Sequence, residues 1–169
     1  ERLFYSLFTN PEVMKSIVIA LNSKNRGLTR KELLSKTGIT DSGSLSRQLK
    51  ALESGAFIMK YDSFGNGKRD SYYKLTDPFC IFYLRFVSDK SSRKKKEWIG
   101  AANTQAVVSW NGLAYENLCF NHIKQIKAAL GISGVSTEES LWSKKCTEDA
   151  EGAQIDLIIE RKDNVVNMC

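Results

Sequence analysis

The sequence predicts a mixed α and β chain (α+β or α/β) built from two modules. In residues 1–87, apolar residues at helical spacing are followed by two short strand-like segments. In residues 98–169, helical segments come first and strand-like segments follow. The charge also differs: residues 1–95 hold 18 Lys and Arg against 9 Asp and Glu, a balance of +9, whereas residues 96–169 hold 7 against 10, a balance of −3. The basic half is therefore the one to test for phosphate affinity.

Two helices open the first module. Asn10 and Pro11 are typical of a helix cap and first position, and an apolar stripe follows at Val13, Ile17, Val18 and Leu21. Thr29 caps the second helix, Glu32 occupies the capping-box position, and Gly38 ends the helix.

The third helix begins at Asp41 or Ser42 and ends at Gly55. Its buried face carries Leu45, Leu49 and Leu52, which lie within about 60° of one another at 100° per residue. A hairpin follows, with arms 57–61 and 71–75 and a turn at 64–69 that is rich in Gly and Asn. Three helices and then a hairpin predict a winged helix-turn-helix.

The outer face of the third helix and the hairpin tip carry the candidate DNA-binding residues. Groove-reading helices place cationic and hydroxyl side chains away from the core, and the dipole of the helix N-terminus favours phosphate. The candidates are Ser44, Ser46, Arg47, Lys50, Lys68 and Arg69. The alternative is that the winged helix is a protein-docking or internal packing module.

A fourth helix leads to the boundary between the modules. Asp77 caps it, Pro78 starts it, and we expect its aromatic residues to line one side as core or an interdomain contact. Residues 88–97 are basic and polar, which indicates a linker, with contact to a nucleic-acid backbone as the alternative.

In residues 98–169 we expect helices at 103–110 and 112–130, broken near Asn111-Gly112. Strands are expected at 140–144, 153–160 and 165–169, with a turn at 161–164.

Two carboxylates of this module occupy positions that otherwise look apolar. Glu116 lies within about 40° of Phe120 and Ile123 on a helical wheel, and Asp156 lies in a strand that looks buried. An ionised carboxylate without a partner is costly to bury. Glu116 and Asp156 are therefore candidate catalytic residues and ligands for a hard cation such as Mg²⁺. The alternative is a satisfied core carboxylate or a salt bridge, for example to Lys127.

Several classes of protein are disfavoured. No apolar run approaches the roughly 18 residues of a membrane span, and no signal peptide is visible. The four cysteines are far apart and His122 is the only histidine, which argues against a zinc site and fits a reducing cytoplasm. The chain lacks a starting Met and ends on an apolar stretch, so we expect a piece of a longer protein.

The order of these segments resembles the C-terminal half of prokaryotic ATPases of the archaeal-ATPase family. The more specific stretches are Asp77-Pro-Phe-Cys-Ile-Phe-Tyr-Leu-Arg-Phe-Val87, Gly112-Leu-Ala-Tyr-Glu116 and Gly152-Ala-Gln-Ile-Asp-Leu-Ile-Ile-Glu-Arg-Lys-Asp163. In that family a P-loop ATPase domain precedes a winged helix, and a module similar to PD-(D/E)xK restriction endonucleases follows.

The resemblance implies that Glu116 is the helix acid and Asp156 the strand acid of an incomplete nuclease-like core. The family's Glu-x-Lys pair would fall beyond Cys169, and ATP would bind only in the missing N-terminal domain, since no Walker motif is present. We therefore expect the fragment to be inactive by itself, with duplex DNA and the ATPase domain as partners. The competing class is a non-catalytic regulatory or protein-interaction region of a signalling ATPase.

Overall fold

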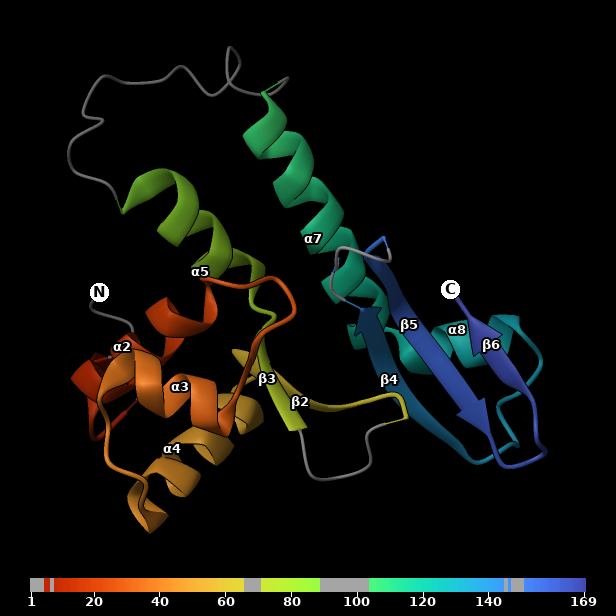
Figure 1. Ribbon diagram of the computed structural model, residues 1–169, viewed down its shortest axis with the longest axis horizontal. Coiled ribbons are helices and arrows are strands. Elements are labelled where there is room, and N and C mark those ends of the chain that lie inside the picture. The colour runs from red at the N-terminus through yellow and green to blue at the C-terminus, as the bar shows by residue number, and fades with distance from the viewer. Residues whose placement is uncertain (1–4, 7, 66–70, 89–103, 145, 147–150) are drawn as a thin grey trace. The chain divides into compact units, whose positions relative to one another are not determined.

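The computed structural model describes residues 5–6, 8–65, 71–88, 104–144, 146 and 151–169 (Figure 1). The chain divides into two compact units. The N-terminal unit comprises residues 1–60 and 72–114, and the C-terminal unit comprises residues 61–71 and 115–169. The protein is therefore mixed α+β, and its strands follow the hydrogen-bonded order β1-β3-β2-β4-β5-β6.

The first elements of the N-terminal unit are helices, and the strands β2 and β3 follow them. The elements are α2 (Pro11–Leu21), β1 (Leu28–Thr29), α3 (Arg30–Thr37), α4 (Gly43–Ser54), β2 (Ile58–Ser63) and β3 (Ser71–Leu75). Strand β1 pairs with β3 in the antiparallel sense, with Leu28 opposite Tyr73. The three expected helices and both expected hairpin arms are thus present.

Local capping sets several of these helix boundaries, as expected. The hydroxyl of Thr29 accepts from the backbone N–H of Glu32 at 3.2 Å, and the Glu32 carboxylate accepts from the N–H of Thr29 at 2.9 Å. The hydroxyl of Ser42 accepts from the N–H of Leu45 at 3.4 Å and caps α4. Asn10 differs, because its side chain makes no capping hydrogen bond although Pro11 does begin α2.

The core of the N-terminal unit is built from the inward faces of these helices. Ile17 of α2, Leu33 of α3 and Leu52 of α4 are completely buried. Gly27 allows β1 to approach β3, because it has a φ of +82° and a Cβ there would lie 2.2 Å from the carbonyl oxygen of Tyr73. No other residue type fits this position without moving the backbone.

The aromatic residues after β3 only partly follow the expected stripe. Helix α5 (Pro78–Phe82), capped by Asp77, continues into a π-helical turn, η2 (Tyr83–Val87). The rings of Phe82 and Phe86 contact Trp110 at centroid distances of 5.5 and 6.2 Å. Phe79, however, is 82% exposed, so its expected place on the packed side was wrong. Phe82 and Phe86 pack against Trp110, whereas Phe79, in the first turn of α5, remains exposed.

The expected helix break at Asn111-Gly112 was also wrong. Helix α7 (Gln105–Asn121) runs through these residues, and the break falls at His122, before α8 (Ile123–Ala129). A glycine inside a helix costs about 0.5–1 kcal/mol. Burial of the Leu113 side chain outweighs that cost, at about 1.5–3 kcal/mol.

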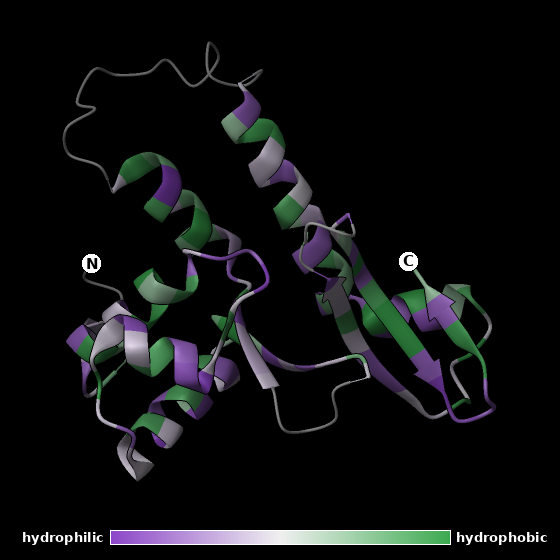
Figure 2. Ribbon diagram, viewed as in Figure 1, coloured by the Kyte–Doolittle hydropathy of each residue, from purple (hydrophilic) through white to green (hydrophobic). Residues whose placement is uncertain are grey.

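The C-terminal unit is a helix-covered sheet. Strand β4 (Thr137–Lys144) pairs antiparallel with β5 (Ala153–Arg161), and β5 pairs antiparallel with β6 (Val166–Met168). The last residues of β2 join the sheet in parallel, with Asp62 opposite Ser140. The middle of β5 is hydrophobic (Figure 2), and Leu157 and Ile159 pack with Ile132 and partly buried residues of α7 and α8. The expected strands and the turn after Arg161 are present.

The expected linker at 88–97 lies, apart from Ser88, outside the described residues. The chain passes from one unit to the other inside α7, between Ala114 and Tyr115. Residues 104–114 accordingly belong with the N-terminal unit rather than with the segment 98–169.

Candidate functional site

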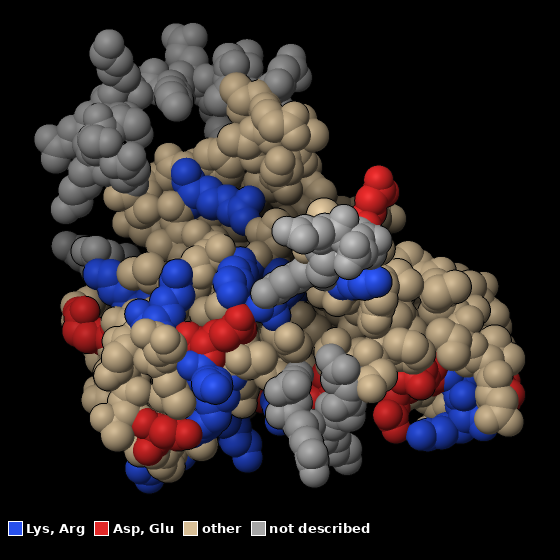
Figure 3. Space-filling model, viewed as in Figure 1, with Lys and Arg blue, Asp and Glu red and all other residues tan. Residues whose placement is uncertain are grey.

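The outer face of α4 is the first candidate site. Leu45, Leu49 and Leu52 are buried, whereas Ser46, Arg47 and Lys50 on the other side of the helix are exposed. Neither Arg47 nor Lys50 forms an ion pair with any residue that the structure describes. Lys and Arg side chains are also spread over the visible face of α2–α4 in Figure 3. This helix therefore offers two exposed cations that are not held in ion pairs within the described part of the chain.

The remaining predicted DNA-binding residues differ in position. Ser44 is half-buried and its hydroxyl accepts a long hydrogen bond of 3.5 Å from the Gln48 amide, so it is less accessible than Ser46. Lys68 and Arg69 lie outside the described residues. The structure thus brings Ser46, Arg47 and Lys50 onto one exposed helix face.

Other cations of the N-terminal unit are held in ion pairs, which sequence reasoning did not find. Lys24 and Arg26 both donate to the Glu32 carboxylate, at 2.8 and 2.7 Å. Arg26 also lies over the ring of Tyr72, 4.8 Å from its centroid. These two cations stabilise the start of α3. They are less available for phosphate than the cations of α4.

The Glu32 carboxylate has a strongly shifted pKa. Burial would raise this pKa, but the hydrogen bond from Lys24, the backbone N–H of Thr29 and the charges of Arg26 and Lys24 outweigh burial. Together they lower the pKa of Glu32 to about 2. Glu32 is therefore ionised throughout the physiological range.

A second ion pair lies at the N-terminus of α4. The guanidinium of Arg30 donates to the carboxylate of Asp41, with one bond of 2.9 Å, and to the backbone carbonyl of Ser42 at 3.3 Å. The hydrogen bond with Asp41 raises the pKa of Arg30, and the same bond lowers the pKa of Asp41. Because Arg30 starts α3 and Ser42 caps α4, this contact ties the two helices together at the turn.

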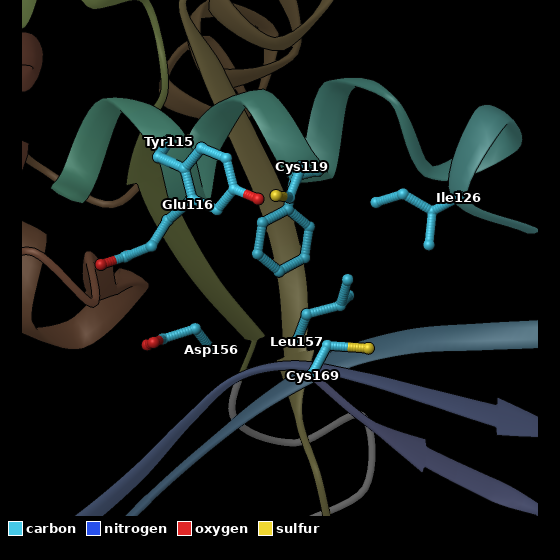
Figure 4. A pocket seen from close by; sticks show the side chains of 8 residues that line it. Tyr115, Glu116, Cys119, Ile126, Asp156, Leu157 and Cys169 are labelled. Carbon is cyan, nitrogen blue, oxygen red and sulfur yellow. The ribbon is translucent and has the colours of Figure 1, made fainter. Parts of the chain in front are cut away.

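The second candidate site is a pocket of about 350 Å³ within the C-terminal unit. Its lining comes from α7, α8, β5 and the last residue of the chain: Tyr115, Glu116, Cys119, Phe120, Ile126, Asp156, Leu157 and Cys169. Figure 4 shows Glu116 extending from α7 toward the sheet, with its carboxylate on the same side of the view as that of Asp156. The two carboxylates singled out from the sequence thus line one pocket.

The hydrogen bonds around the two carboxylates show which of the expected partners they have. Asp156 Oδ1 accepts a hydrogen bond from the Gln154 amide. Lys127, expected as a possible salt-bridge partner, instead donates to Thr137 Oγ1 at 2.7 Å and lies 4.0 Å from Glu139. Lys127 was therefore wrong as the example of a salt-bridge partner, because its side chain is directed to β4. Among the described residues no three Asp, Glu, His or Cys side chains form a group that could hold a metal ion.

Two pocket residues, Cys119 and Cys169, had no expected role. Phe120 and Cys119 share the helix face of Glu116, and this spacing could have indicated Cys119; no sequence signal placed Cys169 there. His122 is exposed, as expected, and its Nδ1 lies 2.9 Å from the carbonyl oxygen of Leu118.

Comparison with known proteins adds no relative: no family model, curated protein or solved structure matches the chain. Within the described residues no helix is both long and apolar enough to span a membrane.

Proposed function

We propose that the N-terminal unit is a winged helix that binds duplex DNA through α4. The observation that carries this proposal is the exposed face of α4, where Arg47 and Lys50 make no ion pair with any described residue. The element order α2, β1, α3, α4, β2, β3 supports it, because a helix-turn-helix followed by a hairpin presents its last helix to the major groove.

The chemistry of this face suits a duplex. Arg47 and Lys50 are three residues apart and lie on neighbouring turns of α4, so both can reach phosphates or base edges in one groove. Ser46 adds a hydroxyl donor near the N-terminal end of the helix. The Arg30 contact with Asp41 and Ser42 links the first residue of α3 to the N-cap of α4, the helix that carries Arg47 and Lys50.

The test is the salt dependence of binding to a random-sequence duplex, measured by fluorescence anisotropy between 50 and 200 mM salt. Each phosphate-bound cation contributes about 0.9 to the slope of log K against log salt. Replacing Arg47 and Lys50 together by Ala is expected to reduce this slope by roughly 1.8 and to weaken binding at every salt concentration.

The matched control removes two exposed cations elsewhere. Lys124 on α8 and Lys144 on β4 are both exposed, and replacing both by Ala removes the same charge from the C-terminal unit. Equal effects of the two double variants would refute the role of α4. Absence of binding at 50 mM salt would favour the competing proposal, a regulatory or protein-interaction region.

A second candidate function is Mg²⁺-assisted phosphodiester cleavage by a nuclease-like C-terminal unit. One observation favours it: Glu116 and Asp156 line the same pocket. Two carboxylates fit a Mg²⁺ site, which commonly uses one or two together with water and substrate oxygens. The fit is partial, because no group of three ligands is found among the described residues. By the family resemblance, an ATP-binding domain would act with this chain.

This candidate is tested on the full-length protein. We expect Mg²⁺-dependent nicking of plasmid DNA that is lost on Asp156→Ala. Cleavage that survives this substitution would remove Asp156 from the proposed reaction.

A further inference from the structure

The pocket of the C-terminal unit combines an apolar wall with two acidic groups. The wall is formed by Cys119, Phe120, Ile126, Leu157 and Cys169, with the ring of Tyr115 at one end. Its volume of about 350 Å³ lies within the range of small-molecule sites, about 300–1,000 Å³. A cavity of this kind is filled most favourably by an apolar body that displaces water from the wall.

The charged groups of the lining have one sign. Glu116 and Asp156 are acidic, and none of the described residues that line the pocket is Lys, Arg or His. Asp156 accepts one hydrogen bond at Oδ1, from Gln154, and its Oδ2 accepts none from the residues that the structure describes. This half-buried carboxylate can therefore accept a further charge-assisted hydrogen bond from a ligand.

We propose that this pocket binds a small organic cation, an ammonium group attached to a hydrocarbon or aromatic body. The ammonium donates to Asp156 and lies near Glu116, and the body packs on Phe120 and Leu157. This site is independent of DNA binding by α4. A divalent metal ion would satisfy the carboxylates too, but it would retain its water and leave the apolar wall hydrated. The charge and the apolar lining together therefore favour the organic cation.

The experiment titrates the intact chain with three probes at pH 7. Binding is measured by isothermal titration calorimetry and by the NMR chemical shifts of the amides of residues 115–126 and 156. 2-Phenylethylammonium carries the charge and the body, 2-phenylethanol carries the body alone, and methylammonium carries the charge alone. We expect 2-phenylethylammonium to bind at least tenfold more tightly than either of the other probes. Equal affinities, or no binding by 2-phenylethylammonium, would overturn the proposal without bearing on DNA binding.

Two variants locate the site. Asp156→Asn keeps the size of the side chain. It should weaken the binding of 2-phenylethylammonium at least tenfold and change the affinity for 2-phenylethanol by less than twofold. Glu160→Gln removes one charge from the same strand, β5, but lies outside the pocket lining, and it should leave both affinities unchanged. Equal losses in the two variants would refute the pocket as the site. The three-probe comparison uses the unaltered chain, so it decides the proposal even if a variant does not fold.

The last part of the experiment titrates the chain with Mg²⁺. Mg²⁺ binding that depends on Asp156, with no binding of 2-phenylethylammonium, would overturn the organic-cation proposal and support the metal candidate. Failure of 1 mM Mg²⁺ to displace 2-phenylethylammonium would support the organic cation.

Discussion

Replacing Glu32 by Gln tests the ion-pair network at the start of α3. The carboxylate accepts hydrogen bonds from the side chains of Lys24 and Arg26 and from the backbone N–H of Thr29. Gln keeps the length of the side chain and an oxygen for the capping hydrogen bond, so the substitution removes chiefly the charge. We expect the N-terminal unit to lose stability while its fold is retained.

The magnitude follows from the pKa of Glu32, which falls from 4.5 to about 2. Since one pKa unit corresponds to about 1.36 kcal/mol, the ceiling is about 3.4 kcal/mol. The side chain is 31% exposed and solvent screens the ion pairs, so we expect a loss of about 1–2 kcal/mol in the free energy of unfolding.

The pH dependence has a definite sign. A lowered folded-state pKa means that the stabilisation is fully present above about pH 4.5 and is lost as the pH falls toward about 2. Urea unfolding at pH 7, 5 and 3 measures this, and the difference between the unaltered chain and Glu32→Gln should be smaller at pH 3 than at pH 7.

Glu53→Gln is the matched control, because Glu53 is an exposed carboxylate on α4. It should change stability by less than about 0.5 kcal/mol. A Glu32→Gln effect that equals the control, or that does not diminish at low pH, would refute the reasoning.

Two further predictions concern packing and thiol reactivity. Gly27→Ala should cost more than about 2 kcal/mol in urea unfolding, because its Cβ would meet the carbonyl of Tyr73; a smaller loss would mean that β1 can shift away. Burial, and then the neighbouring Asp77, raise the pKa of Cys80 to about 12. Iodoacetamide at pH 8 should therefore label exposed Cys169 on the order of 100-fold faster, by intact mass, and equal labelling rates would contradict this.

Local chemistry explains which parts of the fold could be predicted from the sequence. The capping box of Thr29 and Glu32 and the caps at Ser42 and Asp77 involve residues within three positions of each other, so spacing alone defines them. Glu116 and Asp156, which line one pocket, were singled out from the sequence because each was an acidic residue in an apolar pattern.

What could not be predicted depends on contacts between distant residues. Helix α7 continues through Gly112 because Leu113 is buried in a core built from α2, α3 and α4. The partner of Lys127 is decided by the position of β4, and the capture of Lys24 and Arg26 by Glu32 depends on the path of the loop before β1. The place of Cys169 in the pocket follows from the pairing of β6 with β5.

The C-terminal unit is assembled from two stretches of chain that are far apart in the sequence. Residues 61–71 belong to it, and Asp62 and Ser63 pair with Ser140 and Leu141 of β4. A gene truncated to code only for residues 98–169 would thus leave β4 without the neighbour it has here. Cutting the chain at a point after β3 would likewise separate residues 61–71 from the rest of the C-terminal unit. Evolutionary exchange of either half for an unrelated module would have to preserve this shared strand.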